Sequence, residues 1–383
     1  MNRLNQLTEI HQSGKPYIIY KSKKGFNLYT NFSKKIILNN KNIKSFLTKK
    51  NKKKSKDTDL FIGFFGYELL NNLIDVKIPK QKNLNFPKGI FYKPEKKIKL
   101  SNKLNYDFEN FKSGNFKINI NRKNYTKIFN KFKKKIKSGE TYQIKICTKY
   151  KTKSKINPLD FFSRLSDTNL APEAFMIKDN NYSIISCSPE TLIIKKGSNI
   201  STKPIAGTVK KTKQFNKIKA LNYFRKNLKE TKEHNMIVDM ERNDLSRICK
   251  VGSVRLSKQK IVEEYKDLFH YVSLIKGKLK KNINNFEIIK AMMPGGSVIG
   301  CPKINTLNLL NNQEKENRNI YTGSFGYIKF NGDMRFNIII RSILNFKNIS
   351  EISVASGVVV DSNANHEFNE NFLKAKALID LFK

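Results

Sequence analysis

Two segments of this chain carry acidic side chains at helical spacing. Glu230 and Glu233 precede a set of apolar residues in the first segment, while Glu367, Glu370 and Lys374 in the second are spaced i, i+3 and i+7 and so share one helix face. Acids are scarce here, with 31 Asp and Glu against 75 Lys and Arg. Because Mg²⁺ is usually held by one or two carboxylates together with substrate oxygens, the two segments could form a magnesium site. Solvated acidic faces would give the same spacing, so the pattern alone leaves both interpretations open.

Other residues could bind an anion. The glycine-rich stretch at 293–303 (MPGGSVIGCPK) leads into a predicted helix, so its backbone N–H groups and the helix dipole could face a negative charge. It lacks the G-K-[ST] ending of a Walker loop, which argues against nucleotide binding, and a structural turn is the alternative. Arg341 interrupts an apolar run, and a guanidinium among aliphatic side chains needs an anionic partner from the protein or from a substrate. His270 lies in an apolar stretch, which is more typical of a buried core histidine.

The composition narrows the class of protein. The 383 residues carry a formal charge of +44, but the lysines are spread along the whole chain without an RNP-like signature or a helix-turn-helix pattern, so no specific nucleic-acid partner is predicted. A basic nucleic-acid-binding protein is the non-enzymatic alternative. Four cysteines without a C-x-x-C pair argue against a disulfide scaffold or a zinc ribbon, and no apolar run is long enough for a membrane span. We therefore expect a folded cytoplasmic protein.

The elements that must hold these residues predict an α+β fold. Helical periodicity recurs in three segments, at 125–136, 217–247 and 366–382, and strand-like segments are grouped between them. In the last third, strands at 321–330 and 334–346 flank Asn331-Gly332, a dipeptide that favours a type I′ hairpin turn. Strands grouped as hairpins favour antiparallel sheets over a Rossmann arrangement.

Nine short strings, in order along the chain, resemble the chorismate-utilising enzymes, the family of the anthranilate, aminodeoxychorismate, isochorismate and salicylate synthases. The strings are GETYQI (139–144), SPETLI (188–193), KPIAGT (203–208), KEHNMIVDMERNDLSRICKVGSV (232–254), FHYVS (269–273), PGGSVIGCPK (294–303), YTGSFGYI (321–328), FNIIIRS (336–342) and GVVVDS (357–362). Residues 1–120 match only through GFFGYEL (63–69), so the resemblance implies an N-terminal region at 1–120 and a chorismate-binding catalytic domain at 121–383. It also implies a fold of two antiparallel β-sheets packed face to face with flanking helices.

The resemblance further implies a cleft that holds chorismate beside one Mg²⁺. Carried over position by position, Glu233 and Glu370 would be the metal ligands, with Glu230 close by. The groups that would hold the substrate carboxylates are Arg341, Tyr321, Ser297, Lys374 and the backbone at Gly357. Thr208 would face the ring of the substrate, and His270 would assist proton transfer as the enolpyruvyl group leaves.

Gln143 and Ala206 separate the reactions of this family. Isochorismate and salicylate synthases carry a lysine at the position of Gln143 to deprotonate water, which a neutral amide cannot do, so the resemblance implies ammonia as the nucleophile, supplied by a separate glutamine amidotransferase subunit. Ala206 replaces a nucleophilic lysine and favours anthranilate, whereas the strings at 294–303, 321–328 and 336–342 resemble the aminodeoxychorismate branch. We therefore expect amination of chorismate at C4, toward 4-aminobenzoate and folate, with anthranilate as the alternative. A decayed synthase is a further alternative, because Ala355 replaces a glycine that is usual in the family.

Overall fold

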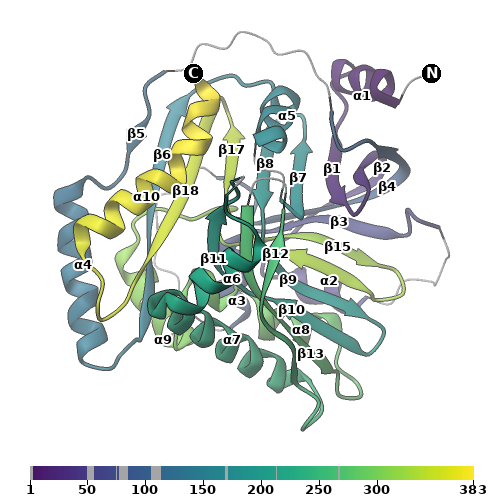
Figure 1. The fold of residues 1–383 in the computed structure, drawn as a ribbon. Helices are drawn as coiled ribbons and strands as arrows, with labels where there is room; N and C mark the ends of the chain where they lie inside the picture. Colours follow the sequence, from purple (N-terminus) through teal and green to yellow (C-terminus); the bar gives the residue numbers. More distant parts are fainter. Residues whose placement is uncertain are drawn as a thin grey trace.

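The structure is a long antiparallel ladder of β-strands covered by helices (Figure 1). The computed structural model describes residues 3–49, 56–74, 76, 85–104, 114–168, 171–212, 214–265 and 268–383. The strand pairings within these ranges are antiparallel even where the partners are far apart in sequence, as with β18 and β6. This architecture confirms the predicted α+β fold.

The first sheet carries the C-terminal part of the chain in its middle. Its strands, in spatial order, are β5 (Lys117–Ile118), β6 (Gln143–Lys153), β18 (Ile349–Val358), β17 (Ser342–Phe346), β8 (Tyr182–Ser188), β7 (Glu173–Lys178) and β1 (Tyr17–Ser22). The short strand β14 (Gly300–Cys301) also pairs with β6. Apolar side chains pack on this sheet from α1 (Arg3–Gln12), α5 (Pro158–Thr168), α10 (Ala364–Ile379) and η2 (Asp380–Phe382).

The second sheet continues the same ladder. Its strands are β2 (Gly25–Ile37), β4 (Gly89–Leu100), β3 (Leu60–Phe65), β15 (Ser324–Lys329), β16 (Met334–Asn337), β9 (Thr191–Lys196), β10 (Asn199–Lys203) and β13 (Leu268–Lys278), with β11 (Ile205–Lys210) and β12 (Arg255–Glu264) both paired to β13. The helices that cover it are α2 (Ile43–Thr48), α3 (Tyr67–Leu73), α6 (Lys217–Lys226), α7 (Leu228–Ile248) and α8 (Asn285–Met292). Two further helices, α4 (Arg122–Lys137) and α9 (Lys303–Gln313), lie against β6 of the first sheet. The ladder passes from the first sheet to the second along β2, which pairs with β1 through residues 25–29 and with β4 through residues 26–37.

The two sheets pack against each other through a shared apolar core. This core joins residues of β1, β7, β8 and β17 to residues of β3, β4 and β15. At its centre the rings of Phe175 and Phe325 stack with centroids 3.8 Å apart, and both side chains are fully buried. Aromatic pairs of this kind add to the free energy of burial. The face-to-face packing implied by the resemblance is therefore present.

The N-terminal residues take part in both sheets. In the first sheet Ile18 of β1 pairs with Ile177 of β7, and in the second Gly63 of β3 pairs with Gly326 of β15. The sequence boundary near residue 120 stays a prediction. Among the described residues, no helix is both long enough and apolar enough to cross a membrane.

The prediction of one strand at 334–346 is wrong. The segment is divided into β16, which pairs with β9 in the second sheet, and β17, which pairs with β8 and β18 in the first. Residues 338–341 connect the two sheets, and Arg341 has a positive φ of 51°. An apolar run has the same pattern whether it stays in one sheet or crosses to another, so the sequence does not show this break.

The hairpin at Asn331-Gly332 is present, but its predicted type I′ turn is wrong. A type I′ turn needs positive φ at both central residues. Here Gly332 has a φ of 87°, whereas Asn331 is not among the residues with positive φ. The side chain of Asn331 instead accepts a hydrogen bond from the Asp333 backbone at 2.9 Å, so an Asx turn competes with the tighter hairpin.

Candidate active site

Eight of the residues predicted to form the site line one cavity of about 380 Å³. They are Glu230, Glu233, Ser297, Tyr321, Arg341, Gly357, Glu370 and Lys374. They come from α7, from α10, from β18, from the 3₁₀ turn η1 (Gly296–Val298) and from the loops before β15 and β17. The tertiary structure thus brings the two acidic helices of the sequence to the same cavity.

The first acidic helix is positioned by its N-terminal cap. The helix predicted at 217–247 is broken at Asn227, whose side chain accepts a hydrogen bond from the Glu230 backbone and so starts α7. Glu233 lies one turn further on and accepts hydrogen bonds on Oε1 from Lys145 Nζ at 2.9 Å and from Gln143 Nε2 at 3.0 Å. The Lys145 charge lowers the pKa of Glu233 to about 2 against the opposing effect of burial. Glu233 is therefore an ionised carboxylate in the cavity.

The second acidic helix, α10, contributes two neighbouring carboxylates. Glu370 forms an ion pair with Lys374 at 2.6 Å, and Lys374 Nζ also donates to the Ala355 carbonyl at 3.0 Å. Burial opposes ionisation of Glu370, but the Lys374 ammonium outweighs it and lowers the pKa of that carboxyl. Glu367, one turn earlier and buried, offers an oxygen within 4.8 Å of ligand atoms of Glu370 and His366. Oxygen donors from two helices, already neutralised by lysine ammonium groups, fit the donor set that Mg²⁺ prefers.

Among the described residues that line the cavity, Arg341 is the cation without a partner. Within the ranges that the structure describes, no residue accepts a hydrogen bond from its guanidinium or forms an ion pair with it, and burial lowers its pKa. Its left-handed backbone conformation, at the crossing between the sheets, places it on the cavity. Arg341 is half-buried, and a guanidinium withdrawn from water without a partner is unfavourable unless a ligand supplies the anion. The cavity therefore suits a small molecule with a carboxylate group.

The remaining predicted ligands line the same cavity. Tyr321 is buried and forms a hydrogen bond with the backbone of Ala355, and burial raises its pKa. Ser297 donates to Glu190 Oε1 at 2.7 Å, so its hydroxyl is already engaged by a neighbouring acid. A methyl group added at Gly357 would lie 2.7 Å from Lys145 Nζ, so the backbone of this residue closely borders the site.

Three ionisable residues among those described around this cavity were not assigned to the site from the sequence: Lys145, Glu190 and Glu367. Glu190 lies within the matched string SPETLI, and Glu367 lies on the same helix face as Glu370, so both had a signal. Lys145 had none, because one lysine among 75 basic residues gives no indication of burial.

The buried carboxyl group of Glu190 should make the stability of the protein depend on pH. Burial raises its pKa to about 7, against an ordinary value of 4.5. The folded state thus holds a proton that the unfolded chain has released, so this contribution to stability is complete below pH 4.5 and is lost as the pH rises through 7. Glutamine stays neutral at every pH. The free energy of unfolding of Glu190→Gln should therefore rise on the order of 2 kcal/mol relative to that of the wild type between pH 4.5 and pH 8. Urea unfolding at a series of pH values measures this, with Glu9→Gln on the exposed surface of α1 as the control, and parallel curves for wild type and Glu190→Gln would contradict it.

Two of the predicted catalytic residues, Gln143 and His270, lie close to residues of the cavity. Gln143 is buried and contacts Glu233, as described above. His270 is buried in β13, opposite Thr208 in the ladder, and it is not among the described residues that line the cavity. Burial, helped by the Arg341 charge, lowers the pKa of His270 to about 4, so its imidazole is neutral at pH 7. The side chains of Ala206 and Thr208 in β11 lie outside the described residues, so their predicted roles are untested.

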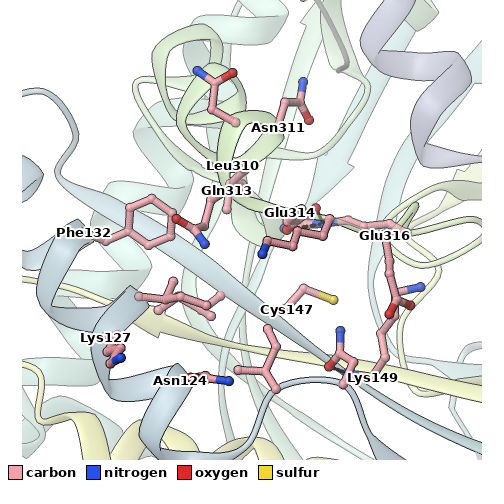
Figure 2. Close-up of a pocket in the computed structure, with 17 residues that line it drawn as sticks. Asn124, Lys127, Phe132, Cys147, Lys149, Leu310, Asn311, Gln313, Glu314 and Glu316 are labelled. Atoms are coloured by element: carbon pink, nitrogen blue, oxygen red, sulfur yellow. Dashed lines mark hydrogen bonds and ion pairs between the residues drawn. The ribbon is translucent and has the colours of Figure 1, made fainter. Parts of the chain in front are cut away.

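A second cavity, of about 640 Å³, lies between α4, β6 and the segment after α9 (Figure 2). Its main charged groups are paired, since Lys149 contacts Glu351 at 2.7 Å and Arg318 contacts Glu314 at 2.6 Å. None of the predicted site residues lines it. Although it is the larger cavity, its buried cations Lys149 and Arg318 are already neutralised, so we place the candidate site in the smaller one.

The smaller cavity combines clustered carboxylates, lysine ammonium groups and a guanidinium without a partner among the described residues, a set of groups that suits a small anion together with a cation. Comparison with known proteins agrees with this class. Residues 11–380 match the family described as chorismate binding enzyme. The chain belongs to this family.

Curated relatives carry two different names. Aminodeoxychorismate synthase component 1 of Bacillus subtilis (strain 168) is 35% identical over 267 residues, which make up 70% of this chain and 57% of the relative. Anthranilate synthase component 1 of Buchnera aphidicola subsp. Pemphigus spyrothecae is 31% identical over an alignment that covers 88% of this chain and 72% of the relative. The chain thus spans little more than half of the Bacillus protein.

Solved structures share the fold. Anthranilate synthase component I from Streptococcus pneumoniae TIGR4 superimposes with a TM-score of 0.78 at 24% identity, covering 95% of this chain and 92% of the other. The menaquinone-specific isochorismate synthase from Escherichia coli gives a TM-score of 0.76 at 15% identity, covering 96% and 89%. At these identities the likeness establishes a common architecture.

Proposed function

We propose that this chain is the chorismate-aminating component of an aminodeoxychorismate synthase. The observation that carries the proposal is the unpaired Arg341 guanidinium, which faces the same cavity as the carboxylates of Glu233 and Glu370. Chorismate is a dicarboxylate, so one carboxylate can pair with Arg341 while the other needs a second source of positive charge. The volume of about 380 Å³ is within the range of small-molecule sites.

In this proposal the residues of the cavity divide into two groups. Glu233 and Glu370, with Glu230 close by, would hold Mg²⁺. The groups that would bind the carboxylates of chorismate are Arg341, Lys374, Tyr321, Ser297 and the backbone of Gly357. When bound, Mg²⁺ would supply positive charge for a substrate carboxylate and for the departing C4 hydroxyl.

The nitrogen nucleophile is inferred from Gln143. Its amide donates to Glu233 and has no basic group with which to activate water, which supports ammonia rather than water as the nucleophile. Chorismate and ammonia would give 4-amino-4-deoxychorismate and water, because the new C–N bond replaces the C4–O bond. The neutral imidazole of His270 would assist proton transfer as the enolpyruvyl group leaves, a step that belongs to the anthranilate reaction. A separate glutamine amidotransferase subunit would supply the ammonia.

Anthranilate synthesis is the second candidate. Ala206 in the string KPIAGT favours it, and the Buchnera relative that covers 88% of this chain carries that name. In that reaction nitrogen would remain at C2, and pyruvate and water would leave. The strings at 294–303, 321–328 and 336–342 favour the C4-amino product, and so does the name of the Bacillus relative.

Product analysis distinguishes the two reactions. We expect the purified chain, incubated with chorismate, MgCl₂ and ammonium chloride, to form a product with the mass of aminodeoxychorismate. Mass spectrometry identifies this product, and reactions without Mg²⁺ or without ammonium are the controls. Fluorescent anthranilate, formed without any added lyase, would contradict the proposed product and support the second candidate. Unchanged chorismate under all conditions, from a chain that melts cooperatively, would support a decayed synthase.

A further inference from the structure

Lys145 of β6 is buried among the carboxylates of the candidate site. Its Nζ lies 2.9 Å from Glu233 Oε1, and 13% of its side chain is exposed. The negative charges of Glu370 and Glu367 also act on it. One ammonium group therefore neutralises the same acids that would hold Mg²⁺.

The opposite strand leaves room for this arrangement. Gly357 of β18 is the register partner of Lys145. A Cβ atom at Gly357 would lie 2.7 Å from Lys145 Nζ and 2.9 Å from Gln143 Nε2, the two groups that donate to Glu233 Oε1. The absence of a side chain at this position thus allows both donors to reach the same carboxylate oxygen.

The two lysines of the cavity differ in their freedom to move. Lys374 pairs with Glu370, but 44% of its side chain is exposed, so its ammonium can turn into solvent at little cost. Lys145 is enclosed, so its charge stays close to Glu233 even when the hydrogen bond is broken. A divalent cation on Glu233 would therefore meet repulsion from Lys145 at short range.

We propose that Lys145 is an internal counter-cation that a divalent cation must displace from Glu233, and that it weakens metal binding to the free site. The inference rests on the proposed magnesium site. It assigns Lys145 a positioning role: the ammonium holds Glu233 in place without metal and sets the concentration of Mg²⁺ at which the metal replaces it.

Calorimetric titration of the full chain with MgCl₂ alone tests this role. We expect Lys145→Met to bind Mg²⁺ roughly tenfold more tightly than the wild type, because the competing charge is gone. Lys145→Arg keeps the charge and should retain weak binding. Lys135→Met is the matched control, since Lys135 also pairs with a glutamate at 2.8 Å, but on the surface. Equal Mg²⁺ affinity in the wild type and in Lys145→Met would overturn the inference while the metal site stands.

Gly357→Ala provides a second variant that leaves Lys145 in the chain. The added methyl group meets only the ends of two flexible side chains, so the fold should tolerate it while Lys145 and Gln143 are moved from Glu233. We expect a several-fold gain in Mg²⁺ affinity, and an unchanged affinity would count against the inference. No Mg²⁺ binding in the wild type, in Lys145→Met or in Gly357→Ala would overturn the magnesium site and the inference together. Thermal melting of each variant with and without MgCl₂ verifies folding, and Lys145→Met should gain more in Tm from MgCl₂ than the wild type.

Discussion

Replacement of Glu370 by alanine is expected to lower the turnover of chorismate by at least about a thousandfold while the fold stays intact. The carboxylate would contribute directly to the proposed magnesium site, so its loss removes charge stabilisation that no other group can replace. Its effect on stability should be small, because its ion pair with Lys374 joins two residues four apart on a half-exposed helix face. Initial rates with saturating Mg²⁺ and ammonium, together with thermal melting, measure the two effects separately.

Glu140→Ala is the control for this experiment. Glu140 forms an ion pair with Lys135 at 2.8 Å, and 39% of its side chain is exposed, against 35% for Glu370. The two substitutions therefore remove similar surface charges, but only one lies in the cavity. Wild-type activity in Glu370→Ala would refute the proposed site, as would an equal loss of activity in both variants. Glu233→Gln should reproduce the loss of turnover, with Glu370 and Glu367 remaining as counter-charges for Lys145.

Arg341→Met should lower kcat/KM for chorismate on the order of a thousandfold and at the same time raise the melting temperature. A charge-assisted bidentate contact with a carboxylate would be lost in the complex, which weakens binding of the substrate and of the transition state. In the free protein the substitution removes a guanidinium that no described residue neutralises, so the free energy of unfolding should rise by roughly 1–2 kcal/mol. Steady-state kinetics tests the expected decrease in kcat/KM, and urea unfolding of the same preparation tests the expected increase in the free energy of unfolding.

Arg335→Met is the matched control, and it should lower the free energy of unfolding where Arg341→Met raises it. Arg335 lies on the neighbouring strand β16, and its guanidinium contacts Glu173, a fully buried carboxylate. Its removal leaves that charge without its main partner, at a cost of roughly 3–5 kcal/mol. A destabilised Arg341→Met would show that Arg341 has a structural partner, and an unchanged kcat/KM would exclude it from substrate binding.

The local pattern of residues in the sequence was sufficient to predict several features of the fold. The apolar spacing around Tyr125 and Phe129 predicts a helix, and α4 spans Arg122–Lys137. Gly63 in the string GFFGYEL predicts a close backbone approach, and a Cβ atom there would lie 1.9 Å from the Ile90 carbonyl oxygen. The helix depends on neighbours within a few residues, and the close approach depends on a glycine where a larger side chain would not fit. Both signals can be recognised from the sequence alone.

The arrangement of the site could not be predicted from local spacing. Spacing within α10 shows that Glu367 and Glu370 share a face, but spacing cannot bring them near Glu233, which is more than 130 positions away along the chain. The resemblance to a family predicted that Glu370 and Glu233 share one site, and both line the same cavity. Lys145 had no such support, because its burial depends on the pairing of β6 with β18 and on the space left by Gly357.

Residue types and short spacings were enough to predict the kind of fold, and they suggested the kind of chemistry that we propose, a cation and an anionic substrate. The positions of charges relative to one another were decided by the assembled sheets, in particular by the crossing at residues 338–341 that carries Arg341 to the cavity. The physical reason is that electrostatic interactions act over a few ångströms in space, whatever the separation in sequence. Which charges are neutralised and which remain available to a ligand is therefore a property of the folded chain.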